Sequence, residues 1–304
     1  MQTTIAGAWR LGLEKADIAR PVAAYLTGRP QCPMSMTLAL PAAMPVGAAC
    51  PIVATTVSHF RHDRQRVAMP HVEAQVVVRF GPALPGGVDV HAMGPGRRVL
   101  RKFIRAGHRA ILVRLRPGTY HAALGVPAAN LSGHPIALDD LWGHTRTQRL
   151  LEQLAGEPDA RAAATLLERA IKERTDCATL VGATPRFLHK ALQSLQTSGV
   201  TTVAHELGVS ERHLRRVLQQ TLGVGPKTYA RLKRFARAVH AAQSGRGIHW
   251  SAIAADAGYY DQAHLIADFR SIAGTTPQLL LAELRDSEQA AHVENDQVRF
   301  PVLR

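Results

Sequence analysis

Two separate segments of the chain repeat one pattern, and this repeat constrains the fold more than any other feature. In residues 200–223 apolar side chains recur at helical spacing on both sides of a glycine, and residues 249–277 do the same. The matching positions are Val203, Ala204, Leu207 and Gly208 in the first segment and Ile253, Ala254, Ala257 and Gly258 in the second. Because glycine tolerates the backbone conformation of a tight turn, each segment predicts two short helices joined at the glycine.

Residues at the helix ends support this interpretation. The hydroxyl of Ser210 can cap the second helix of the first segment, and Gly274 and Pro277 end the corresponding helix of the second. Two helices joined in this way form a helix-turn-helix, whose second helix lies in a DNA major groove. A helical hairpin with a solvated basic face is the alternative for one segment alone, and the repeat argues against it.

Basic charge is concentrated on the first segment and on the stretch that follows it. Residues 210–246 hold nine Lys and Arg side chains and one acid, Glu211, within a chain of net charge +14. Residues 226–244 predict a helix that starts at Pro226. At ~1.5 Å per residue this helix is roughly 28 Å long, and adjacent major grooves repeat at ~34 Å. Both the charge and the length favour duplex DNA as the partner.

Candidate DNA contacts follow from these helices. Arg212, Arg215 and Arg216 lie on the predicted exposed side of the second helix, where arginine can bond guanine O6 and N7. Contact with phosphates, or a solvated face, is the alternative for each of them. The other candidates, for phosphates or for bases, are Thr201, Thr202, Ser210, Arg231, Arg234, Gln262, His264 and Arg270.

The stretches SERHLRRVLQQTLGVGPKTYARLKRFARA and AGYYDQAHLIADFRSIAGTTP resemble the DNA-binding region of AraC/XylS-type transcriptional regulators. The resemblance implies a sequence-specific regulator that is not an enzyme, needs no cofactor and binds no metal. It implies double-stranded DNA and RNA polymerase as partners, activation of transcription, a homodimer, and base contacts by Arg212, Arg215 and Arg216. Ala267 stands where the family offers a basic residue, beside Asp268, so the first motif is expected to carry most of the specificity.

The first 137 residues predict a β-rich domain, so the whole chain is expected to be α+β. Strands are predicted over residues 71–81, 88–94, 97–104 and 109–120, which favours a small barrel or sandwich. Residues 113–143 resemble the N-terminal domain of a subset of AraC-like regulators. The segment MPHVEAQ departs from the polar, glycine-containing turn expected there. The resemblance implies a sensor domain that could take a small-molecule effector.

Residues 138–199 predict three helices with balanced charge, eight bases against eight acids. Such a region fits a connector that self-associates better than it fits a DNA surface. The expected divisions are therefore a β-rich domain over 1–137, a dimerising connector over 138–199, a DNA-binding domain over 200–285, and a flexible tail over 286–304.

Several other features leave alternatives open. Residues 97–116 hold eight Lys and Arg and no acid, which could mark a nucleic-acid surface, an anionic effector site, or simply the exposed face of strands. His59, His62 and His71 form the best-placed metal candidate, but no carboxylate-histidine pattern accompanies them and no helix is predicted there. The three cysteines, Cys32, Cys50 and Cys177, contain no CxxC pair and suit a reducing compartment.

The remaining class of alternatives concerns catalysis and non-specific binding. The sequence contains no nucleophile elbow, no phosphate-binding glycine loop and no HExxH motif. A DNA-binding module attached to an enzyme, or an architectural DNA-binding protein, are the rival hypotheses. With neither a signal peptide nor a membrane span in the pattern, the expected location is the cytoplasm.

Overall fold

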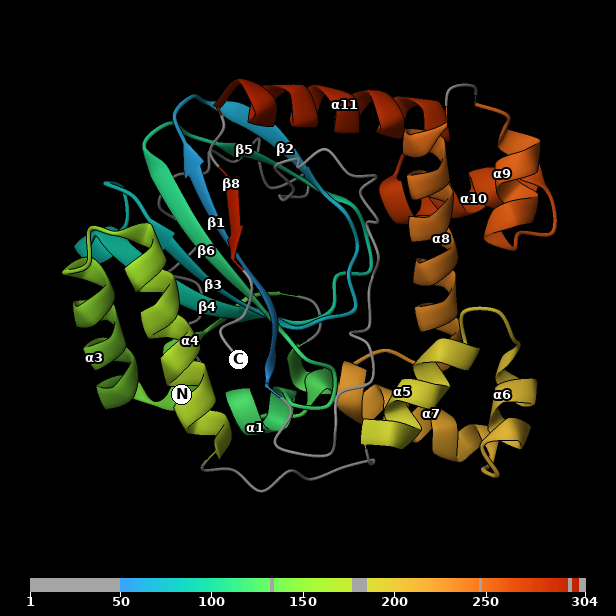
Figure 1. Cartoon of the computed structure of the whole chain (residues 1–304), viewed down its shortest axis with the longest axis horizontal. Helices are drawn as coiled ribbons and strands as arrows, with labels where there is room; N and C mark the ends of the chain where they lie inside the picture. The colour runs from blue at the N-terminus through green and yellow to red at the C-terminus, as the bar shows by residue number, and fades with distance from the viewer. Residues whose placement is uncertain (1–49, 132–133, 177–184, 246–247, 295–296, 301–304) are drawn as a thin grey trace, which may run out of the picture.

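The computed structural model describes residues 50–131, 134–176, 185–245, 248–294 and 297–300. It has a β-rich part followed by a helical part, which confirms the predicted α+β class. Figure 1 shows the long helix α8 (Pro226–Ser244) standing between two groups of short helices, with the sheet on the other side of the molecule. The segment before residue 50 lies outside the described residues.

The main sheet is open and antiparallel. Its strands are β1 (Ile52–Phe60), β3 (Gln75–Phe80), β4 (Val88–Met93), β6 (His108–Leu115), β7 (Ile136–Ala137) and β8 (Gln297–Phe300). They are ordered β7-β4-β3-β6-β1-β8, so the sheet ends at two edges and does not close into a barrel. A separate two-stranded ribbon pairs β2 (Arg64–Ala68) with β5 (Leu100–Ile104).

The observed strands differ in detail from the predicted ones. β4, β5 and β6 fall in the segments where strands were predicted, but the strand expected from residue 71 begins at Gln75. His71 makes only an isolated bridge to Gly96, with His71 N donating to Gly96 O at 3.0 Å. β2 was not predicted, because its sequence RQRVA offers neither a long apolar run nor a clear alternation.

Helices cover one face of the sheet. They are α1 (Tyr120–Leu124), α2 (Leu138–Trp142), α3 (His144–Ala155) and α4 (Ala160–Asp176). The first of the three helices expected in residues 138–199 is divided into α2 and α3 at Gly143, whose φ of 82° is compatible with glycine and not with a continuing helix. Inward-facing Val76, Val90 and Val113 pack with Leu154 and Leu167 in one buried core. On the same side Thr55 Oγ1 donates to the buried carboxylate of Glu168 at 2.5 Å.

The helical part contains seven further helices within the described residues. They are α5 (Pro185–Ser194), α6 (Val200–Glu206), α7 (Glu211–Leu222), α8, α9 (Trp250–Ala257), α10 (Gln262–Ala273) and α11 (Pro277–Glu294). Their apolar sides form a second core, which also contains Val67, Val72 and Val99 from the β-rich part. The two parts of the chain therefore share a hydrophobic interface.

Two of the expected regions can be compared with the described elements. The tail expected to be flexible from Asp286 continues α11 to Glu294, and β8 then pairs antiparallel with β1. The helices of residues 138–199, where self-association was expected, bury their apolar sides inside the chain where the structure describes them. Leu150 and Leu154 of α3 pack in the sheet core, and Leu188 and Leu192 of α5 pack in the helical core.

Candidate nucleic-acid interface

The first repeated segment folds as two helices around a left-handed glycine. α6 ends before Gly208, whose φ is 65°, and Val209 N donates to Ala204 O at 3.0 Å to close the turn. Ser210 is the N-cap of α7, as predicted, and its Oγ accepts from His213 N at 3.2 Å. These bonds therefore fix the residue at which α7 begins and the direction of α7 relative to α6.

The second segment repeats this geometry bond for bond. Gly258 has a φ of 82°, and Tyr259 N donates to Ala254 O at 2.8 Å. Asp261 replaces the capping serine, and its Oδ1 accepts from His264 N at 2.7 Å. Two independent turns with the same hydrogen bonds are the geometry of a tandem helix-turn-helix, with α7 and α10 as the second helices.

The helix α8 carries both motifs. Gly225 and Pro226 start it directly after α7, and its buried Phe235 packs against Phe269 of α10 with ring centroids 4.7 Å apart. Trp250 of α9 contacts the same Phe269 ring edge-on at 6.0 Å. These aromatic contacts hold the second motif on α8, in addition to the apolar area that they bury.

The three arginines predicted to contact bases lie on the exposed side of α7. Arg212, Arg215 and Arg216 are all exposed, whereas Leu214, Val217 and Leu218 on the opposite side are buried. Arg216 Nη2 lies 3.2 Å from His213 Nδ1, and Arg212 and Arg215 make no hydrogen bond or ion pair with any residue that the structure describes. The α7 surface is therefore a cationic face with guanidinium groups available to a ligand.

The residues at the start of the first motif are already engaged in part. Thr201 Oγ1 donates to Glu211 Oε1 at 2.5 Å, which joins α6 to the first turn of α7. The Ser210 hydroxyl is occupied by its capping bond. Thr202 remains exposed beside them. Of these candidates, Thr202 has the side chain that the fold leaves most open to a phosphate.

Arginines of α8 form a network with the second motif and do not simply face solvent. Arg231 Nε donates to Asp268 Oδ1 of α10 at 2.7 Å, and the Asp268 side chain is 8% exposed. Arg234 lies over the Tyr259 ring, 5.3 Å from its centroid. Burial, together with the Asp268 charge, raises the pKa of Tyr259 well above its usual value. Burial, and then the neighbouring Arg234 charge, lowers the pKa of Arg237.

The second recognition helix presents a less basic surface than the first. Gln262, His264, Ala267 and Arg270 are exposed on α10, and Asp268 is turned inward to Arg231. The His264 ring contacts the Tyr259 ring edge-on at 5.3 Å. Sequence reasoning missed Tyr260, which is 93% exposed in the turn just before α10. An aromatic side chain next to a predicted turn glycine is the signal that could have identified it.

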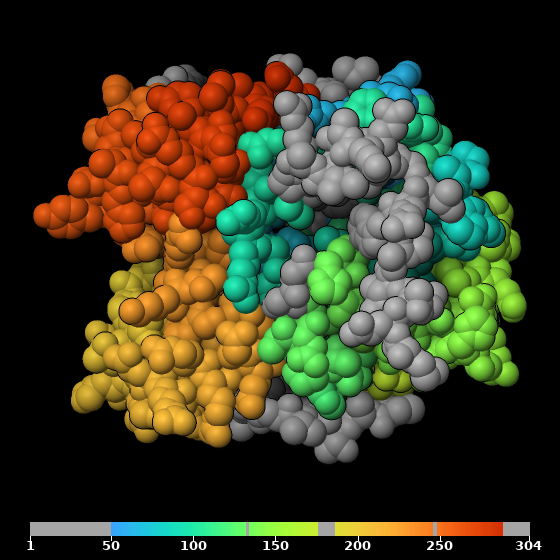
Figure 2. Space-filling model, turned by 180° about the vertical axis from the view of Figure 1, so that it is seen from behind, coloured from blue at the N-terminus to red at the C-terminus, as the bar shows by residue number. Residues whose placement is uncertain are grey.

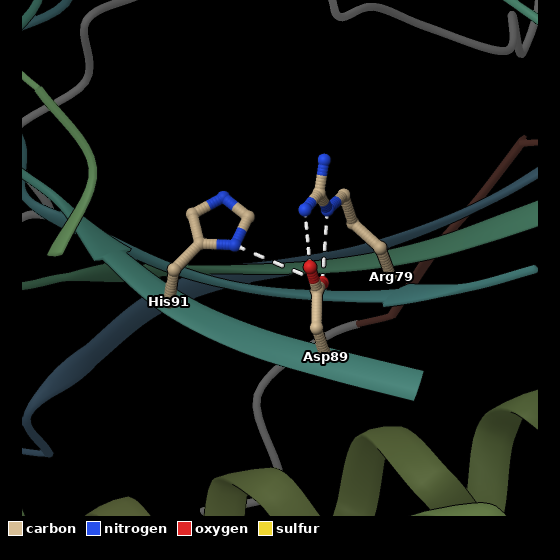
Figure 3. A network of polar contacts seen from close by, with 3 residues as sticks. All are labelled: Arg79, Asp89 and His91. Carbon is tan, nitrogen blue, oxygen red and sulfur yellow. Dashed lines mark hydrogen bonds and ion pairs between the residues drawn. The ribbon is translucent and has the colours of Figure 1, made fainter. Parts of the chain in front are cut away.

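A second polar cluster lies in the β-rich part, on the face of the sheet turned away from α4. Figure 3 shows Arg79, Asp89 and His91 projecting together from β3 and β4. Arg79 forms a bidentate ion pair with Asp89, with Nε to Oδ1 at 2.9 Å, and His91 Nδ1 lies 3.9 Å from Asp89. Burial, with Arg79 adding to it, lowers the pKa of His91 to about 4 and that of Lys102 to about 8. Cationic groups thus outnumber the one carboxylate in a partly dehydrated environment.

Other sequence candidates have different positions. Within the described residues no group of three His, Cys, Asp or Glu side chains could hold a metal ion, and His71 Nδ1 contacts Glu73 O at 2.8 Å. Cys50 is a free, half-buried thiol, whereas Cys32 and Cys177 lie outside the described residues. No described helix combines the length and hydropathy that a bilayer crossing requires.

Comparison with known proteins identifies the helical part. Residues 203–282 match a family model described as a helix-turn-helix domain, the type found in AraC regulators. This range covers both turns, α8 and the start of α11. No curated protein matches the sequence.

The comparison with solved structures gives matches of low sequence identity and low TM-score. The structure of ToxT from Vibrio cholerae O395 has 11% sequence identity, a TM-score of 0.38, and covers 76% of this chain and 97% of its own. Unsaturated fatty acid bound wild-type ToxT from Vibrio cholerae strain SCE256 has 10% identity, a TM-score of 0.38, and coverages of 78% and 98%. The AraC-like transcriptional activator CuxR has 17% identity, a TM-score of 0.17, and coverages of 62% and 68%.

Proposed function

Since residues 203–282 belong to the AraC type of helix-turn-helix domains, we propose that this chain is a transcriptional regulator that recognises a specific promoter sequence. One observation carries the proposal: two turns with matching hydrogen bonds deliver α7 and α10 from a single connecting helix. At ~1.5 Å per residue α8 spans roughly 28 Å, which suits recognition helices that enter successive major grooves ~34 Å apart.

In the proposed complex the first motif supplies most of the base recognition. Arg212, Arg215 and Arg216 face outward on α7, and a guanidinium can donate two hydrogen bonds to guanine. Thr202 and the N-terminal N–H groups of α6 would hold a phosphate, which positions the helix without selecting sequence. Arg234 and Arg270 are the further candidates for phosphate contact.

The second motif would read DNA more permissively. Gln262 and His264 are exposed at the start of α10, where Gln262 can be bidentate to adenine. Ala267 offers only a methyl group, and Asp268 is paired with Arg231 and so presents no free carboxylate to the backbone phosphates. The exposed ring of Tyr260 can pack against a sugar or a base edge. The expected binding site is therefore polarised, with one strongly preferred segment.

Selection from random DNA, followed by binding titrations at fixed salt, tests the proposal. Arg215→Ala should weaken binding to the selected site by about 1–3 kcal/mol and relax the preference at one base position. Arg169→Ala on α4 is the matched control, since Arg169 is 63% exposed and lies on the sheet domain. Unchanged affinity and unchanged preference in single alanine variants of Arg212, Arg215 and Arg216 would refute α7 as the reading helix.

The same titrations separate this function from its rivals. A regulator should prefer its selected site over random DNA by about 10³-fold or more at physiological salt. An architectural protein would show a salt-dependent affinity with little sequence preference. Equal information content under α7 and α10 would contradict the polarised site.

A small-molecule effector of the β-rich part is the second element of the proposal. Figure 3 shows Arg79 and Asp89 on the sheet face away from α4. The charges of Arg79 and Lys102, which both interact with the one carboxylate of Asp89, favour a small anionic effector. Lys102→Met should abolish the thermal shift that an anionic effector gives with the wild type, while Arg105→Ala, at an exposed position directly after β5, should preserve it. An effector shift that survives Lys102→Met would place the ligand elsewhere.

The proposal also includes assembly and partners. We infer a homodimer in the cytoplasm that activates transcription through contact with RNA polymerase. Self-association through residues 138–199 would use the polar outer sides of α3 and α4, since their apolar sides are buried in the sheet core. Sedimentation velocity of the full chain, with and without the selected DNA, measures this directly, and a monomer under both conditions would refute it.

A further inference from the structure

One short segment of the β-rich part contacts the ends of both recognition helices. This segment, residues 97–101, is called the strap below, and its last two residues are the first two of β5. Arg97 Nη2 donates to Gly223 O at the C-terminal end of α7, at 3.0 Å. Arg101 Nη1 donates to Ala273 O, the last residue of α10, at 2.9 Å. The strap therefore touches both motifs at the same end of their second helices.

Backbone and apolar contacts reinforce the second attachment. Val99 N donates to Ile272 O at 2.8 Å, and the Val99 side chain is 2% exposed within the helical core. Arg101 also forms an ion pair with Glu283 of α11, with Nε to Oε2 at 2.8 Å. Figure 2 shows the teal surface near residue 100 lying against both the red-orange and the gold parts of the helical domain.

The chemistry of these contacts is specific to helix ends. The last carbonyl groups of a helix have no intrahelical donor and lie at the negative end of its dipole. The guanidinium group of Arg101 meets this need at α10, and that of Arg97 meets it at α7 together with Gln219 Nε2, which donates to the same Gly223 O at 3.1 Å. A contact that only filled the core would require the side chain of Val99 and neither arginine.

The strap is short enough to restrict relative motion. Four residue steps of extended chain span at most about 14 Å, so the backbones of Arg97 and Arg101 cannot lie farther apart than this. The C-terminal ends of α7 and α10 are bonded to these two residues, which limits how far they can separate. The other direct connection between the motifs is α8 with the residues that follow it. On the far side the strap is anchored through the ribbon, where Arg101 pairs with Val67 of β2.

We propose that Arg97 and Arg101 are positioning residues for DNA recognition: the strap sets the separation and angle of α7 and α10, and so the base-pair spacing that the protein accepts. This inference rests on the proposed function, because spacing has meaning only if both helices enter DNA. It assigns a role to part of the basic stretch 97–116, for which sequence alone left three alternatives. It also makes the β-rich part a determinant of specificity without any contact to DNA.

The first test uses DNA. The full chain is titrated with its selected site and with versions in which 1 or 2 base pairs are inserted between the two segments. The wild type should lose about tenfold or more in affinity at the longer spacing, because one recognition helix then misses its segment. In Arg97→Ala/Arg101→Ala this loss should fall to about threefold or less, since the helices can follow the altered spacing. Arg98→Ala is the matched control, because Arg98 is an exposed strap arginine with no hydrogen bond to a described residue.

The second test needs no DNA, so failure of the strap can be told apart from failure of the proposed function. Hydrogen exchange at the Val99 amide reports its bond to Ile272 O. Exchange should accelerate by about tenfold or more in the double variant and stay at the wild-type rate in Arg98→Ala, with global unfolding unchanged. A wild type that binds no DNA specifically refutes the proposed function alone. Spacing discrimination that stays at the wild-type level in a folded double variant, or an unchanged Val99 exchange rate, overturns the strap.

Discussion

The ion pair between Arg231 and Asp268 offers a quantitative test of how the second motif is held on α8. Asp268 is 8% exposed and Arg231 is 39% exposed, and the two meet at 2.7 Å. Asp268 Oδ2 is buried, and among the described residues Arg231 supplies the ion pair that compensates the negative charge of this carboxylate. Removing the two partners should therefore have unequal effects.

The magnitude follows from burial. Two unit charges ~4 Å apart attract by about 4 kcal/mol at an effective dielectric constant of ~20. Orphaning one member of a fully buried pair costs about 3–5 kcal/mol, and water at the exposed edge of Arg231 reduces this. Arg231→Met should thus lower the free energy of unfolding by about 2–3 kcal/mol. Asp268→Asn leaves a half-exposed cation that water can reach, and should cost only about 1 kcal/mol.

A double-mutant cycle by urea denaturation measures the coupling. Arg231→Met combined with Asp268→Asn should be more stable than the sum of the single effects by about 1–2 kcal/mol, because no buried carboxylate remains. Equal m-values across the four proteins would show that the same surface unfolds. Additive effects, or a larger loss in Asp268→Asn than in Arg231→Met, would refute the claim that Arg231 compensates a buried charge.

Three further predictions concern stability elsewhere. Burial lowers the pKa of Lys233 from 10.5 to about 8, so between pH 8 and pH 10.5 the unfolded chain binds a proton that the folded chain does not. As the pH rises through this range, the free energy of unfolding of the wild type should therefore increase by about 3 kcal/mol relative to that of Lys233→Met. Parallel curves of stability against pH for the two proteins would contradict this. Gly258→Ala should cost about 1–2 kcal/mol because its φ is 82°, whereas Gly156→Ala at φ −78° should cost nothing, as thermal or urea unfolding will show. Thr55→Val removes a donor from the buried Glu168 carboxylate and should cost about 1–3 kcal/mol in urea unfolding, and a neutral effect would show that the bond is not formed.

Local sequence chemistry was sufficient to predict the two motifs. Gly208, Ser210 and Gly258 are each set by contacts within a few residues, so their turn and cap geometry follows from the residue types. The exposure of Arg212, Arg215 and Arg216 follows from helical periodicity once the buried side of α7 is recognised. The candidate reading surface was therefore predictable before any tertiary contact was known.

Long-range contacts account for what the sequence did not predict. The pairing of Arg231 with Asp268, and of Arg101 with Glu283, joins residues far apart in the chain, and no local pattern marks either pair. Periodicity identifies the buried side of a helix but not its partner, so the sequence could not show that the apolar sides of α3 and α4 pack against the sheet. β8 was missed because a short strand at a sheet edge depends on the neighbour that it pairs with, here β1.

The membership of Val67, Val72 and Val99 in the helical core has a consequence for how the chain unfolds. A cooperative unit is defined by shared burial, and by that criterion the ribbon belongs with the helix-turn-helix motifs and not with the sheet that precedes and follows it. Cutting the chain at residue 200 would remove these three valines from the helical core and leave them exposed on the N-terminal fragment. A chimera that exchanges the helix-turn-helix motifs between such regulators should therefore fold only when the β2–β5 ribbon is exchanged with them. The smallest transferable module is thus discontinuous in sequence.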